Sequence, residues 1–66
     1  MAERRSGQVL FEITYRGTVA RCSAIDVATN VEVSIVAPAT YSRFTLEQNA
    51  LRKLNRALEE RAARRR

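Results

Sequence analysis

The chain has 66 residues, 45% of them hydrophobic, which suits one small domain with a thin apolar core. It contains one cysteine and no histidine, which excludes an internal disulfide and a zinc site built from those two residue types. The net charge of +5 comes mainly from arginines near both ends, a pattern that fits either nucleic-acid contact or a solubilising role. We therefore expect no metal and no cofactor.

The sequence also indicates the cellular compartment of the protein. No segment approaches the roughly 20 apolar residues of a membrane-spanning helix. The start, MAERRSGQ, is charged and no apolar run follows it, so it lacks the pattern of a secretory signal. Together with the unpaired thiol of Cys22, these features predict a cytoplasmic protein.

Three segments carry the patterns of β-strands. In QVLFEITYR, residues 8–16, apolar and polar residues alternate, which predicts a strand with one dominant apolar face. Residues 18–26 (TVARCSAID) and 31–36 (VEVSIV) are predicted to be the second and third strands. Pro38 is expected to end the third, because proline cannot continue a strand ladder.

Two turns are predicted to join these strands. Arg16 and Gly17 are assigned to the first, with a positive φ at the glycine, and residues 27–30 to the second, with Asn30 left-handed. The resulting register pairs Tyr15 with Thr18, Ile13 with Ala20, Phe11 with Cys22, Val9 with Ala24, Asp26 with Val31, Ala24 with Val33 and Cys22 with Ile35. Both hairpins then place their apolar residues on one face, an agreement that a one-residue slip would destroy.

The remaining sequence predicts a helix over residues 45–66. Thr45 is assigned as the N-cap, because Gln48 follows three residues later as in a capping box. The apolar stripe of the helix consists of Leu51, Leu54 and Leu58. Arg61 falls on the same stripe, so the packed part should end near Leu58. The helix is expected to lie in a trough formed by the small residues of the middle strand, Ala20, Cys22 and Ala24.

The predicted fold class is therefore α+β, a three-stranded antiparallel β-meander packed on one C-terminal α-helix in the order β-β-β-α. Residues 8–60 are predicted to form this single domain. We expect a flexible basic segment at residues 1–7 and a frayed arginine-rich tail at residues 61–66.

Residue types suited to catalysis are scarce, and we expect no enzyme. Without histidine, proton transfer would fall to carboxylates, a lysine or the thiol. Glu12 is predicted to face Arg21 as a cross-strand ion pair, and Asp26 to bind backbone amides of the loop that follows it. Cys22 is predicted to be a core residue, with no histidine or lysine assigned nearby, so its pKa should not be lowered.

Our leading hypothesis is a non-enzymatic interaction module that binds a protein partner or a second copy of itself. The hypothesis rests on apolar residues on the outer face of the sheet: Leu10, Val19, Ile25 and Val36. The alternative is non-specific RNA or DNA binding through the basic helix face and tail. Its contact residues would be Arg52, Lys53, Arg56, Arg61, Arg64, Arg65 and Arg66. Glu59 and Glu60 interrupt that face, and no aromatic residue is interleaved for base stacking.

One stretch resembles a known family. AIDVATNVEVSIVAP, residues 24–38, followed by LRKLNRAL, is similar to very short uncharacterised bacterial proteins that read approximately A-I-D-P-x-T-G-x-E-V-S-I-V-G-P before an A-x-x-K-L helix. The resemblance covers about residues 9–58. Val27 replaces the usual proline and Asn30 the usual glycine, and both changes fit the same turn because asparagine tolerates a left-handed backbone. The resemblance implies a free-standing small domain and carries over no activity, cofactor or site residue.

Overall fold

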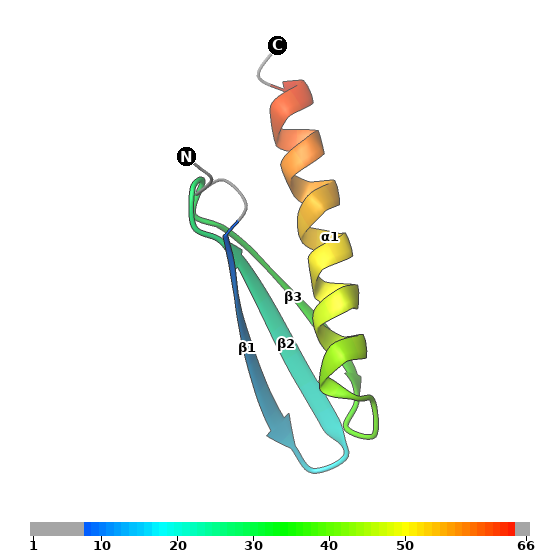
Figure 1. Cartoon of the computed structure of the whole chain (residues 1–66). Helices are drawn as coiled ribbons and strands as arrows, with labels where there is room; N and C mark the ends of the chain where they lie inside the picture. Colours follow the sequence, from blue (N-terminus) through cyan, green and yellow to red (C-terminus); the bar gives the residue numbers. More distant parts are fainter. Residues whose placement is uncertain (1–7, 65–66) are drawn as a thin grey trace.

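The computed structural model describes residues 8–64, which form a three-stranded sheet and one helix (Figure 1). The elements are β1 (Val9–Arg16), β2 (Val19–Asp26), β3 (Val31–Pro38) and α1 (Arg43–Arg64). β2 lies between β1 and β3, and both pairings are antiparallel. The predicted α+β meander with a C-terminal helix is thus confirmed. The predicted basic segment at residues 1–7, and residues 65 and 66, lie outside the described residues.

The second hairpin has the predicted register. Asp26 faces Val31, and Cys22 faces Ile35. Asn30 adopts the expected left-handed conformation, with φ 63°. The buried Asp26 carboxylate accepts hydrogen bonds from the backbone N–H of Thr29 (3.0 Å) and from its hydroxyl (2.7 Å). Asp26 therefore stabilises the loop as predicted, because both of its described hydrogen bonds close the turn.

The first hairpin differs from the prediction, because its turn lies one residue later along the chain. Each residue of β1 therefore pairs with a residue of β2 two positions away from the predicted partner. Gly17 and Thr18 form the turn, so Arg16 faces Val19 and Ile13 faces Cys22. Gly17 has φ 59°, and Thr18 needs no positive φ, which is the arrangement of a type II′ turn with glycine first. The predicted turn would have required a positive φ at Arg16, which is costly for a residue with a side chain. The shift preserves the faces, because side chains alternate with a period of two.

The same shift overturns one predicted contact. Arg21 faces Thr14 instead of Glu12, and Glu12 faces Ser23. The prediction of a directly opposed Glu12–Arg21 ion pair is therefore wrong, because it depended on the incorrect turn.

The core lies between α1 and the middle of the sheet. The fully buried residues are Ala20, Cys22 and Ala24 of β2 and Leu46, Ala50 and Leu54 of α1. The helix packs against β2 and β3 but hardly touches β1 (Figure 1). The predicted trough is thus confirmed, because short side chains on β2 let the helix approach closely. On β1, Phe11 and Ile13 remain only half-buried.

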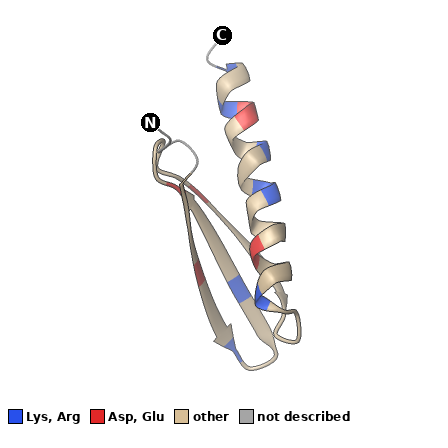
Figure 2. Cartoon of the chain, in the orientation of Figure 1, with Lys and Arg blue, Asp and Glu red and all other residues tan. Residues whose placement is uncertain are grey.

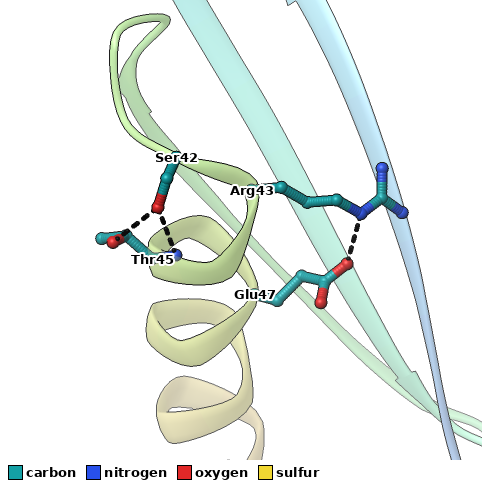
Figure 3. A network of polar contacts seen from close by, with 4 residues as sticks. All are labelled: Ser42, Arg43, Thr45 and Glu47. Atoms are coloured by element: carbon teal, nitrogen blue, oxygen red, sulfur yellow. Dashed lines mark hydrogen bonds and ion pairs between the residues drawn. The ribbon is translucent and has the colours of Figure 1, made fainter.

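The helix begins earlier than predicted. Ser42 is the N-cap, because its Oγ accepts a hydrogen bond from the backbone N–H of Thr45 (3.1 Å; Figure 3). The assignment of Thr45 as N-cap is therefore wrong, and Thr45 is the third helical residue. Arg43 in the first turn donates its Nε–H to Glu47 Oε2 at 2.9 Å (Figure 3). This ion pair offsets the unfavourable position of a cation at a helix N-terminus.

The far end of the helix extends past the sheet (Figure 1). Leu58 is half-buried, and every described side chain after it is exposed. The packed part therefore ends at Leu58, as the position of Arg61 on the stripe predicts. Residues 61–64 continue α1.

Candidate interaction surfaces

The outer face of the sheet, which faces away from α1, bears the predicted apolar residues in two separate places. Leu10 (51% exposed) lies opposite the half-buried Ile25, near the β2–β3 loop. Val36 (68% exposed) and Val19 (42% exposed) lie near the other end, beside Pro38. The structure thus brings Val19 and Val36 together and keeps them apart from Leu10 and Ile25.

A polar row separates these two apolar patches. Glu12, Ser23 and Ser34 face one another across the three strands. The hydroxyls of Ser23 and Ser34 are hydrogen-bonded at 2.9 Å. Because this row crosses the whole sheet, a partner that covered the full outer face would have to satisfy polar groups at its centre.

The charged residues of the sheet are also segregated along the strands (Figure 2). The half of the sheet nearer the β2–β3 loop is acidic and carries Glu12, Asp26 and Glu32. The half nearer the β1–β2 turn is basic and carries Arg16 and Arg21. The charge of the sheet therefore changes along the strands, from negative near the β2–β3 loop to positive near the β1–β2 turn.

Further apolar side chains are exposed where the β1–β2 turn and the start of α1 meet. Tyr15 and Tyr41 are exposed, and Phe44 is 70% exposed. The sequence reasoning missed Phe44. The sequence does contain a signal for its exposure. With Ser42 as the N-cap, Phe44 is part of the helix, and it lies about 200° around the helix from the buried Leu46. Phe44 must then face away from the core.

The predicted nucleic-acid contacts do not share one face of the helix. Arg52 and Arg61 are about two and a half helical turns apart, which places them on opposite sides of α1. Lys53 donates its ammonium group to the backbone oxygen of Ser34 at 2.8 Å, and Arg52 donates to the Asn49 side chain at 3.3 Å.

Other basic residues are interrupted or lie at the end of the helix. Arg56 has Glu59 and Glu60 as its i+3 and i+4 neighbours, which reduces the positive potential there. Arg61 and Arg64 are exposed and lie in the last turns of α1. Figure 2 shows basic residues in blue at this projecting end. Arg65 and Arg66 lie outside the described residues.

Cys22 is buried in the centre of the core. Burial raises the pKa of its thiol, the charge of Glu47 raises that pKa further, and Arg43 opposes the change. A buried thiol with a raised pKa is a poor nucleophile, because the thiolate is the reactive form. Cys22 is thus a core residue, as predicted.

Residues 8–64 also bear on metal binding and on membrane insertion. Residues 8–64 contain no group of cysteine, aspartate and glutamate side chains that could hold a metal ion. The single described helix is too polar to cross a membrane.

Comparison with known proteins identifies a family. Residues 6–62 match a family described as a domain of unknown function, DUF6898. No curated protein and no solved structure matches the chain. Because the family match spans most of the sequence, the chain belongs to the DUF6898 family.

Proposed function

We propose that the chain is a small non-enzymatic module that binds another protein through the outer face of its sheet. The contact centres on Val19 and Val36, which we call the valine patch. The observation that carries this proposal is the exposure of Val36, 68%, on a sheet face that no other element of residues 8–64 covers. Large apolar side chains gathered on an uncovered face favour association with another protein surface.

The surroundings of the valine patch indicate the chemistry of its partner. Arg21 lies directly opposite Val36, and Arg16 directly opposite Val19. No carboxylate lies in these two rows of the outer face. The partner should therefore offer apolar side chains bordered by aspartate or glutamate.

The structural roles of the buried titratable groups support the proposal that the chain is not an enzyme. Cys22 packs in the core, and Asp26 closes a turn. We also assign the protein to the cytoplasm, and its free thiol supports that location.

Site-specific photo-crosslinking in native cells tests the valine patch. A photoreactive amino acid would replace Val36, with Val27 as the matched control, because Val27 is also an exposed valine (45%) but lies in the β2–β3 loop. We expect a discrete cross-linked protein from position 36 only, and its loss on Val19→Glu. Identical products from both positions, or none from position 36, would contradict the proposal.

A second candidate is non-specific nucleic-acid binding by the projecting end of α1. The exposure of Arg61 and Arg64 beyond the sheet favours it. If about four phosphates of a single strand are contacted, raising the salt from about 50 to 200 mM should weaken binding roughly fifty-fold. Fluorescence anisotropy with a short labelled oligonucleotide measures this. Affinity that ignores salt, or that survives deletion of residues 61–66, excludes this candidate.

A further inference from the structure

The two edges of the sheet differ in which backbone groups they present. The Val27 N–H donates to the Gln8 oxygen at 3.2 Å. The backbone N–H and C=O groups of Gln8, and of every second residue after it in β1, therefore point toward β2. The residues whose N–H and C=O groups point away from the sheet are therefore Val9, Phe11, Ile13 and Tyr15. We call these outward groups the β1 edge.

The corresponding edge of β3 is blocked. The Ala39 N–H donates to the Thr18 oxygen at 2.8 Å, which fixes Ser34 and Pro38 among the outward residues of β3. Lys53 already occupies the outward oxygen of Ser34 at 2.8 Å. Pro38 has no N–H to offer. Both features are devices by which proteins prevent an edge strand from pairing with another chain.

The β1 edge has no such protection in the described residues. β1 contains neither proline nor an inward-facing charge. No side chain or loop among residues 8–64 is hydrogen-bonded to the outward groups of Val9, Phe11, Ile13 or Tyr15. The helix also lies over β2 and β3, so it leaves the approach to β1 open (Figure 1). An extended strand could therefore add to the sheet here.

We propose that the strand that pairs with the β1 edge is β1 of a second copy, antiparallel, with Ile13 on the two-fold axis. Phe11 of each copy then faces Tyr15 of the other on the helix side of a continuous six-stranded sheet. About six backbone hydrogen bonds form across the axis. Paired aromatic residues are favourable cross-strand neighbours, and this register contains the Phe–Tyr pair twice.

The charge segregation of the sheet selects a second copy as the occupant. Antiparallel pairing sets the acidic half of one sheet beside the basic half of the other. With Ile13 on the axis, Glu12 faces Thr14 of the other copy and has two diagonal neighbours there, Arg16 and the second Glu12. Its carboxylate can turn toward Arg16 to form an ion pair, which also moves it away from the second Glu12. If Glu12 lay on the axis instead, it would face its own copy, a like-charge contact that disfavours that register.

The helices do not obstruct this arrangement. Each α1 lies over β2 and β3, so about four strand spacings, roughly 19 Å, separate the helix axes of the two copies. Helices in direct contact are about 8–10 Å apart. The valine patch stays exposed in the dimer, so this inference does not depend on the proposed function.

Sedimentation equilibrium of the full chain tests the pairing. We expect a mass of twice 7.5 kDa at micromolar concentration. Glu12→Arg and Arg16→Glu should each weaken dimerisation about tenfold or more, and the double exchange should restore it. Both residues are exposed, so the fold should survive, which circular dichroism checks. Glu32→Arg is the matched control, because Glu32 lies on β3, far from the β1 edge.

The register is tested by mixed disulfides. Glu12→Cys and Thr14→Cys chains should cross-link with each other when mixed, because position 12 of one copy faces position 14 of the other. Neither variant should cross-link with itself, because neither position faces its own counterpart. Cys22 does not interfere, because it is buried. A 7.5 kDa monomer at high concentration would overturn the proposal. So would a dimer unaffected by the charge reversals, or one whose single-cysteine variants cross-link with themselves.

Discussion

Leu54 is the residue on which we expect the packing of the helix to depend most. Its side chain is fully buried, and it belongs to the same cluster as Cys22 and Ala24 of β2. Leu54→Ala removes the equivalent of about three carbon groups, worth about 2.4 kcal/mol at roughly 0.8 kcal/mol each. The neighbouring side chains on β2 are too short to fill the space, so a cavity remains. We expect a total loss of about 3–4 kcal/mol.

That loss is close to the whole stability of a domain of this size, about 3–5 kcal/mol. Urea unfolding followed by far-ultraviolet circular dichroism, at one fixed protein concentration, should find Leu54→Ala largely unfolded without denaturant. Leu54→Met keeps the volume and should cost less than about 1.5 kcal/mol. It also keeps the prediction measurable if the alanine variant does not fold.

Leu51 provides the matched control, because it undergoes the same substitution one turn earlier but is only half-buried. Leu51→Ala should cost about half as much as Leu54→Ala. If the two alanine variants lost equal stability, the burial of Leu54 in the β2 trough would not be the cause, and our description of the core would be refuted.

Three further predictions concern the helix cap, the loop and the thiol. Ser42→Ala should lower the free energy of unfolding by about 1 kcal/mol because a cap is lost, whereas Thr45→Ala should cost clearly less, as urea titration can show. Asp26→Ala and Thr29→Val should each cost about 1–3 kcal/mol and be non-additive in a double-mutant cycle; full additivity would mean that their hydrogen bonds contribute little. Above about pH 8.5 the unfolded chain gives up the Cys22 proton before the folded chain does, because burial raises the thiol pKa in the folded state. Stability should therefore fall with rising pH more steeply than in Cys22→Ala, and equal slopes would contradict this.

The predictions that succeeded are those that depend on local chemistry. Asn30 could be placed in a left-handed turn because few side chains tolerate that conformation, and this fixed the register of the second hairpin. The faces of all three strands followed from alternation of apolar and polar residues. The end of the packed helix at Leu58 followed from the charge of Arg61 on the same stripe.

The errors arose where two local solutions compete. Gly17 can be the second residue of one turn or the first of another, and only the type II′ arrangement spares Arg16 a positive φ. Ser42 and Thr45 are both capping residues. A helix that starts after Ser42 gains hydrogen bonds to Ser42 from the Thr45 and Leu46 N–H groups. It also gains the Arg43–Glu47 ion pair. Each choice could have been ranked from these energies, but apolar patterning alone does not separate the alternatives.

The sequence by itself therefore determined the element types, the inward faces and the scarcity of catalytic groups, because these follow from residue chemistry and period. Only the tertiary structure decided how the surfaces are arranged. It showed that the outer face has two separate apolar patches and that Glu12 does not lie opposite Arg21. Both arrangements depend on the exact strand pairing. The tertiary structure also set α1 over β2 and β3, with Lys53 reaching the β3 edge, so that no described element covers the β1 edge. The position of a helix across a sheet depends on packing between distant residues, which no local pattern contains.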